Sequence, residues 1–403
     1  MRILITIYFS LITLASTAQC DQNTVWNNTT TNAVCTEVDG AVRHWYANSL
    51  PDHVTGTFPG QGNPNAISAQ EAYLTMCAYP LEAGQFTDLL INGFGSMGGC
   101  PTYEFGIALN GLEWDPIAAE WFENPNTGAI NYDWNENPLS PNINLGTDMN
   151  DAHVQPTGKY HYHGDPTNYI AGLGISAASH SPIIGYAADG FPLYYKYVYV
   201  DPQDSNSTIT EATSCFQLKS GNRPGDGTTA PDGTYDGTYV EDFEYNGSLG
   251  GCILDQCNGR FGITPDFPNG TYYYVMTSEF PVVPRCFAGT PDMSFSIGPP
   301  PAGCGTSNAD QICSALNVGI STSEIADRLM VYPVPTDSDY LNVLFAGEQS
   351  LHPTKVSIID NSGRLVRTEA YNQRVSIASL TNGIYFLKLS FQDTEITKRF
   401  IKD

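Results

Sequence analysis

The run Tyr160-His161-Tyr162-His163-Gly164 places two of the chain's seven histidines two residues apart. In a β-strand, successive side chains point to opposite faces, so His161 and His163 would share one face and Tyr160 and Tyr162 the other. Two imidazoles on one strand face can converge on a single metal ion. The same pair can also form hydrogen bonds inside a polar core, so the spacing alone leaves both interpretations open.

A metal site needs a third ligand, and the sequence offers several. His153 lies eight residues before His161 and would return to it across a hairpin closed by residues 156–158. His180 follows the motif after a glycine-rich loop, and Asp151 and Asp189 are oxygen alternatives. Because imidazoles dominate this set, zinc or copper is chemically better suited than calcium.

Two other interpretations of the histidine pair stay open at this point. His161 and His163 can be structural groups that bond to buried tyrosines, or an acid–base pair that works without metal. The chain has no Gly-x-Ser-x-Gly elbow and no phosphate-binding glycine loop with lysine, so no reaction is assigned and the question of enzyme activity stays open. Twenty-four tyrosines and five tryptophans also suit a surface module that binds glycans or proteins without metal.

The charge and the N-terminus indicate where the protein acts. A formal net charge of −25 argues against nucleic-acid binding, which needs basic patches. Arg2, an apolar stretch and Ser16-Thr17-Ala18 predict a signal peptide over residues 1–18. No later stretch has the length of apolar sequence that a transmembrane helix needs. We therefore expect an exported chain without a transmembrane segment.

All ten cysteines follow the predicted cleavage point, and an even number in an exported chain predicts disulfides. The spacing suggests three local bridges, although sequence does not determine connectivity. These pairs are Cys252 with Cys257, Cys304 with Cys313, and Cys77 with Cys100.

The elements that must position these residues are mainly strands. An Asn-Gly turn within 106–114 predicts a hairpin, and 271–276 and 193–200 each predict a strand. Asp115-Pro116, followed by the mostly apolar residues 117–122, predicts a short helix. Residues 299–324, rich in Pro and Ser, read as a linker between a large β-rich region at 19–298 and a small β module at 325–403.

The large region also resembles a known family. It is similar to the YHYH family, named for the tetrapeptide, over a core of about 38–297. The resemblance implies a domain and carries no particular reaction with it. The motifs that support it lie at 106–111, 148–156, 158–164, 181–192, 254–260 and 264–272.

Residues 325–403 resemble the type IX secretion sorting domain of Bacteroidota. The motifs are 331–335, 360–364, 382–385 and the terminal Lys398 to Asp403, with Val334 where the family usually has Asn. The resemblance implies a small Ig-like β-sandwich recognised by the type IX machinery. It also implies a protein that is secreted or attached to the outer cell surface, where cell-surface polysaccharide or glycan is an expected partner.

Overall fold

The structure is a computed structural model that describes residues 20–60, 62–89, 102–268 and 270–297 of the large region. Beyond these it describes 308, 309, 313, 329–332, 339–345, 353, 355–361, 364–371, 374–390 and 395–402. The predicted signal peptide, Cys100 and Cys304 lie outside these residues. The described elements are almost all strands, which confirms the mainly β fold class. None of the described helices has the length and apolarity needed to cross a membrane.

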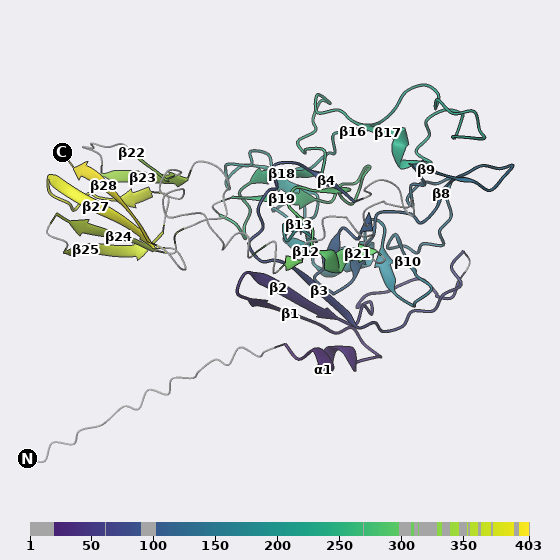
Figure 1. Cartoon of the computed structure of the whole chain (residues 1–403), viewed down its shortest axis with the longest axis horizontal. Helices are drawn as coiled ribbons and strands as arrows, with labels where there is room; N and C mark the ends of the chain where they lie inside the picture. Colours follow the sequence, from purple (N-terminus) through teal and green to yellow (C-terminus); the bar gives the residue numbers. More distant parts are fainter. Residues whose placement is uncertain are drawn as a thin grey trace, which may run out of the picture.

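An eight-stranded mixed sheet forms the centre of the large region (Figure 1). Two neighbouring pairs, β11 with β7 and β13 with β19, run parallel, and the other described pairs run antiparallel. In spatial order the strands are β10 (Ala152–Val154), β11 (Tyr160–Tyr162), β7 (Glu113–Trp114), β6 (Gly106–Ala108), β12 (Ile183–Ala187), β13 (Pro192–Tyr194), β19 (Thr271–Val275) and β18 (Gly259–Gly262).

This central sheet is buried on both faces. Every residue of β6, β7, β11 and β13 is buried, and Trp114, Tyr160, Tyr162 and Tyr274 are fully enclosed. Strands covered on both sides lose the alternation of apolar and polar residues that a half-exposed strand shows. The polar groups that such strands carry must therefore find partners within the protein.

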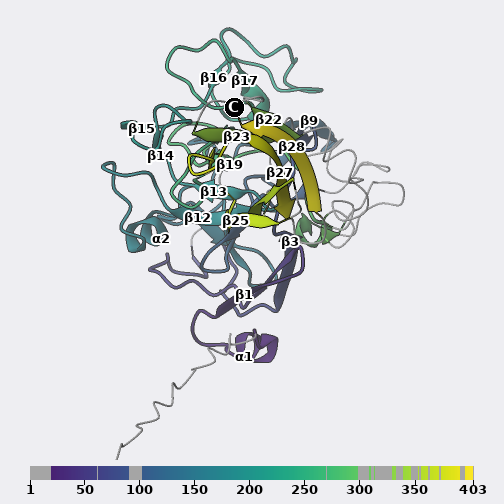
Figure 2. The same cartoon turned by 90° about the vertical axis from the view of Figure 1, so that its left-hand side faces the viewer.

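A second, three-stranded antiparallel sheet packs below the first, with the short helix α1 beside it (Figure 2). Trp45 and Leu74 of this sheet join the same core as Trp114 and Phe105. The elements are α1 (Gln22–Trp26), β1 (Val34–Asp39), β2 (Val42–Ala47) and β3 (Ala72–Cys77).

Short ladders and turns fill the rest of the large region. The paired strands are β8 (Trp121–Glu123) with β9 (Ile130–Asn135), β14 (Tyr197–Tyr199) with β15 (Ile209–Glu211), β16 (Phe216–Leu218) with β17 (Phe243–Tyr245), β20 (Cys286–Phe287) with β4 (Thr87–Asp88), and β21 (Ser296–Ile297) with β5 (Thr102–Tyr103). The remaining elements are α2 (Thr167–Gly172) and the 3-10 turns η1 (Val240–Asp242) and η2 (Met293–Phe295).

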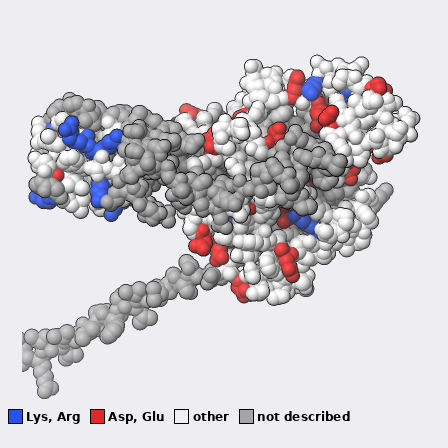
Figure 3. All heavy atoms as spheres, in the orientation of Figure 1, with Lys and Arg blue, Asp and Glu red and all other residues white. Residues whose placement is uncertain are grey.

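The C-terminal strands form a separate sandwich. Leu341 and Val375 from one sheet and Ile358, Leu387 and Phe400 from the other build a shared core. The first sheet is β22 (Leu329–Tyr332), β23 (Tyr340–Phe345) and β26 (Arg374–Ser376); the second is β25 (Leu365–Ala370), β24 (Lys355–Asp360), β27 (Gly383–Ser390) and β28 (Glu395–Lys402). Nine of the chain's 17 basic residues fall in 325–403, and blue atoms gather on this sandwich in Figure 3.

Several predicted elements are confirmed. The Asn-Gly turn joins β6 to β7, and Gly111 has the positive φ of 81° that this tight connection requires. The strand predicted at 271–276 is β19. The single strand predicted at 193–200 is instead divided into the end of β13 and β14, which pair with different partners.

The helix predicted after Asp115 is wrong. The Asp115 carboxylate does accept the amide of Ile117, at 3.2 Å, but the following residues run without helical structure into β8. The carbonyls of Ala118 and Glu120 accept hydrogen bonds from the Asn135 side chain, at 2.9 and 3.0 Å. These long-range bonds satisfy carbonyls that a helix would satisfy internally, so tertiary contacts override the local signal.

The disulfide predictions are also wrong in their pairing. Each of the three predicted bridges joined cysteines close in sequence, whereas the structure joins three of its pairs over separations of 29, 37 and 236 residues. Short sequence spacing does not by itself bring two cysteines together, because a disulfide needs Cα atoms within about 7 Å and side chains that point toward each other. The bridges are Cys20–Cys35, Cys77–Cys313, Cys215–Cys252 and Cys257–Cys286, and no described cysteine is free.

Candidate metal centre

The hairpin of β10 and β11 brings His153 opposite His161. The two residues are direct partners in the antiparallel register, so their side chains emerge on the same face. The connecting turn is closed by the Gly158 amide, which donates to the Gln155 carbonyl at 2.8 Å. Gly158 has φ +88°, and a Cβ at this position would overlap the Ser68 hydroxyl. The hairpin predicted from residues 156–158 is therefore confirmed.

His163 lies just beyond the end of β11 and is held there by Asp151. The backbone amide of His163 donates to the Asp151 carbonyl at 2.7 Å. Asp151 has φ 48°, and its carboxylate accepts the amide of Asp165 at 3.0 Å. Asp151 thus orients the backbone on both sides of Gly164, which keeps the His163 ring on the same side as His161.

The three imidazoles converge through their Nε2 atoms. His163 Nε2 is 3.1 Å from His161 Nε2 and 3.0 Å from His153 Nε2. The ligand atoms of the three residues all lie within 4.8 Å of one another. Three bonds of 2.0–2.1 Å from a tetrahedral zinc would separate neighbouring nitrogens by roughly 3.3 Å, so the spacing is close to that of a metal site.

Hydrogen bonds on the far side of two rings determine which nitrogen carries the proton. His153 Nδ1 lies 2.7 Å from the Leu145 carbonyl, and His161 Nδ1 lies 3.4 Å from the Lys159 carbonyl. A carbonyl only accepts, so each Nδ1 is the donor and each Nε2 presents a lone pair. A neutral His163 holds at most one proton on Nε2, which leaves one of the two lone pairs without a donor. A cation at the shared centre would satisfy all three.

Burial favours the neutral form that binds metal. His161 and His163 are 1% and 3% exposed, and His153 is half-buried. Burial, with the neighbouring histidines, lowers the pKa of His161 well below its usual value. Burial and His153 lower the pKa of His163 to about 3. Both rings are therefore neutral near pH 7, as metal coordination requires.

Comparison with known families accounts for the tetrapeptide and for the C-terminal strands. Residues 97–289 match the model of the YHYH protein family, and residues 330–403 match that of the secretion system C-terminal sorting domain. The chain contains a YHYH domain and a secretion sorting domain. None of the curated proteins matches it. The sorting domain indicates a protein that is secreted or attached to the cell surface.

The tyrosines of the YHYH motif point away from the histidines, as predicted. Tyr160 donates to the Asp148 carboxylate at 2.8 Å and accepts from the Asn150 amide at 3.2 Å. The Tyr162 hydroxyl lies 2.7 Å from His53 Nε2 and accepts from the Asn110 side chain at 2.9 Å. Both rings belong to the core of the YHYH domain, so the tyrosines anchor the strand that carries His161.

His180 lies outside this cluster. Its ring packs against Tyr194 and Tyr199, at centroid distances of 5.1 and 4.8 Å, and its Nδ1 donates to the Ser181 carbonyl at 2.8 Å. The structure therefore brings His153, not His180, together with the His-x-His pair among the residues that it describes.

The two predicted carboxylates have other partners. Asp189 lies in the turn between β12 and β13, where it accepts Tyr274 Oη at 2.6 Å and the Gly289 amide at 2.9 Å. Burial raises the Asp189 pKa to about 6 despite these bonds. Asp151 organises the turn after His163, as described above. Neither joins the group of converging ligand atoms in the described part of the chain.

Sequence reasoning missed a buried ion-pair network beside the histidines. Lys159 Nζ lies 2.5 Å from Glu104 and 3.2 Å from Glu113. Lys159 is the only lysine or arginine between residues 44 and 195, and this isolation in an acidic region was a usable signal that it is paired. Its charge adds to the effects that lower the His161 pKa.

Two further groups lie near His163: Asp115, which the sequence suggested only as a helix cap, and Arg285, which had no sequence signal. The Asp115 amide donates to the Tyr162 carbonyl at 2.8 Å. Burial raises the pKa of the Asp115 carboxyl to about 7, and the negative charge of Glu104 adds to this effect. Arg285, which donates to the Pro116 carbonyl, also contributes to lowering the His163 pKa. The approach of Asp115 depends on β7 running beside β11, which only the fold reveals.

Proposed function

We propose that this chain is an exported protein that binds one transition-metal ion, zinc or copper, through Nε2 of His153, His161 and His163. The observation that carries the proposal is the convergence of three Nε2 atoms, two of them fixed as lone-pair donors by carbonyls behind their rings. Imidazole nitrogen suits both metals, whereas calcium and magnesium prefer oxygen.

The donor set supports a site with an open coordination position. In the described residues, no fourth His, Cys or carboxylate joins the three histidines. Three histidines with one open position are typical of catalytic zinc, whereas structural zinc sites have four protein ligands. When bound, such a metal would supply a polarised water or a position for a substrate oxygen. The three imidazoles would hold it, and the half-buried His153 marks the side closest to solvent.

The sorting domain supports the route of export. We propose that type IX secretion machinery recognises residues 325–403 after removal of residues 1–18, and that 299–324 connects this module to the YHYH domain. The metal-binding region would then act on the outer cell surface or in the medium. The excess of acidic residues in 19–298 suits a soluble surface domain.

Elemental analysis tests the metal proposal. The purified chain is reconstituted separately with zinc and with copper, desalted and analysed for metal per chain. We expect near-stoichiometric metal in the wild type and little in a His161→Ala/His163→Ala double variant. His44→Ala is the matched control, because His44 bonds Tyr73 at 2.9 Å on the three-stranded sheet and should leave the metal content unchanged.

Circular dichroism confirms that each variant is folded, and His153→Ala provides a variant at a less buried position. His180→Ala should retain full metal content. Absence of metal after reconstitution, or equal metal in the double variant, would reject the proposal. Retention of a glycan or protein ligand by metal-free protein would instead support the alternative of a surface binding module.

A further inference from the structure

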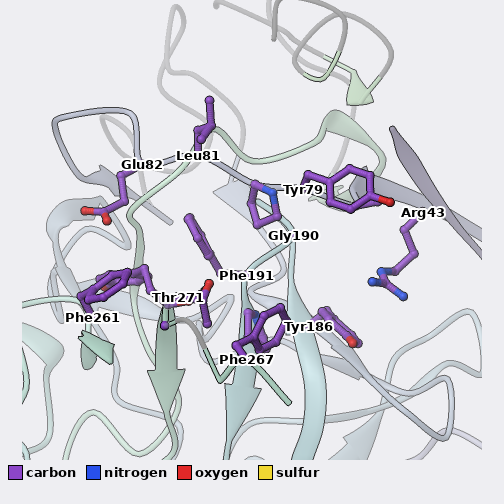
Figure 4. Close-up of a pocket in the computed structure, with 15 residues that line it drawn as sticks. Arg43, Tyr79, Leu81, Glu82, Tyr186, Gly190, Phe191, Phe261, Phe267 and Thr271 are labelled. Carbon is purple, nitrogen blue, oxygen red and sulfur yellow. Dashed lines mark hydrogen bonds between the residues drawn. The ribbon is translucent and has the colours of Figure 1, made fainter. Parts of the chain in front are cut away.

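A second candidate site lies toward the opposite edge of the central sheet from the histidines. It is a pocket of about 150 Å³ between the segment that follows β3 and the strands β12, β13, β18 and β19 (Figure 4). The histidines are carried by β10 and β11, at the other end of the same strand order. The pocket and the candidate metal centre are therefore separate, and neither argument depends on the other.

Close backbone packing forms one wall of the pocket. Gly190, in the turn between β12 and β13, has φ +92°, and a Cβ at this position would overlap the Cys77 carbonyl. A residue with a side chain would push the turn away from β3. The glycine thus holds Phe191 and Pro192 against the segment 78–82, and these residues line the pocket together.

The lining is mostly aromatic and apolar. Phe191, Phe261 and Phe267 offer no hydrogen-bonding groups, and the Tyr272 hydroxyl is already bonded to Asp255 at 3.0 Å. A sugar would leave most of its hydroxyls unpaired against such walls, at a cost for each. The pocket therefore favours a flat apolar body over a carbohydrate. A cavity of about 150 Å³ with this kind of lining accommodates one benzene ring.

Arg43 gives the pocket one unpaired cation. Six of the seven basic residues in 19–298 donate to an oxygen: Lys159, Lys196, Lys219, Arg223, Arg260 and Arg285. Arg43 is the seventh, and its side chain forms no hydrogen bond or ion pair with any described residue. It lies over the Tyr186 ring at 4.3 Å, and its Nε is buried without a partner.

This absence is informative because carboxylates are abundant. Residues 19–298 contain 31 acidic side chains, yet none described pairs with Arg43. A buried guanidinium nitrogen without an acceptor is costly unless a ligand satisfies it. Figure 4 shows Arg43 and Glu82 on opposite sides of the pocket, with Phe191 between them. An anionic group would therefore be attracted to the Arg43 side.

We propose that this pocket binds a small aromatic carboxylate of one ring, with the ring against Phe191 and Phe267 and the carboxylate on Arg43. The guanidinium would donate charge-assisted hydrogen bonds to the carboxylate while keeping its contact with Tyr186. The ligand class follows from the size of the pocket, its mostly aromatic and apolar lining, and the Arg43 guanidinium, whose Nε is buried without a partner.

Calorimetric titration of the full chain tests the proposal with two probes of equal size, phenylacetate and phenylacetamide. The wild type should bind phenylacetate about tenfold or more tightly than phenylacetamide, since the charged hydrogen bonds are lost in the amide. Arg43→Gln should remove this preference. Phe267→Ala should weaken binding of both probes.

Arg374→Gln is the matched control, because Arg374 also lies over a tyrosine, Tyr340, at 4.2 Å, but in the C-terminal sandwich. It should leave binding unchanged, and thermal melts verify that each variant is folded. The proposal is overturned if the wild type shows no saturable binding of phenylacetate. It is also overturned if Arg43→Gln prefers phenylacetate to phenylacetamide as strongly as the wild type does. Binding of glucuronate in place of phenylacetate would overturn the assignment of an aromatic ligand.

Discussion

Replacing Gly158 by Ala tests whether the turn between β10 and β11 sets the histidine geometry. Gly158 closes the hairpin that places His153 opposite His161, and its φ is +88°. An L-residue in a left-handed conformation costs about 1–2 kcal/mol. A Cβ here would also overlap Ser68 Oγ and lie 3.0 Å from Ser68 Cβ, so the 66–68 segment must move.

We expect the two effects together to lower the free energy of unfolding by about 2–4 kcal/mol, from backbone strain and an overpacked contact. Gly174→Ala separates them. Gly174 has φ +63°, but a Cβ there meets nothing within 4 Å, so that variant should show only the backbone strain. Adding Ser68→Ala to Gly158→Ala should recover part of the difference.

Urea unfolding of the three variants measures the stabilities, and elemental analysis measures the metal retained. Because the turn sets the register of His153 and His161, Gly158→Ala should lower metal content, whereas Gly174→Ala should not. If Gly158→Ala is no less stable than Gly174→Ala and retains full metal, the turn does not determine the site geometry and the reasoning fails.

Two further predictions concern the stability of the YHYH domain. The pKa of Asp189 is about 6 in the folded state against a usual 3.8, so the folded state binds this proton more tightly than the unfolded state does. The resulting stabilisation is present at about pH 4 and is lost as the pH rises through 6, which lowers the free energy of unfolding by about 3 kcal/mol. Asp189→Asn should remove this pH dependence in urea unfolding from pH 4 to 7, and an unchanged pH dependence would contradict the prediction. The Cys215–Cys252 bridge spans 37 residues, and a Cys215→Ala/Cys252→Ala double variant should lower the free energy of unfolding by about 4 kcal/mol. The loss is measured as a lower unfolding midpoint. An unchanged midpoint would show that other contacts constrain the loop.

The strands that carry the histidines were predicted from the sequence more accurately than the segment after Asp115 or the disulfide pairing. Alternation in the Tyr-His-Tyr-His run correctly separated histidines from tyrosines, because side-chain direction in a strand depends only on local backbone geometry. The helix predicted after Asp115 failed since its carbonyls bond to Asn135, which lies well beyond any local window. The disulfide predictions failed for the same reason: Cys77–Cys313 and Cys257–Cys286 join residues 236 and 29 positions apart, so tertiary folding decides which cysteines meet.

What the sequence determined by itself was local or specified by motif: the mainly β class, the hairpin that carries His153 and His161, and the sorting domain at the C-terminus. Only the tertiary structure decided that His153 and not His180 meets the pair, that Leu145 orients one of the rings, and that Arg43 has no described partner. These features depend on contacts between segments far apart in the chain. Spacing within a strand determines where a side chain points, whereas packing between strands determines what it meets.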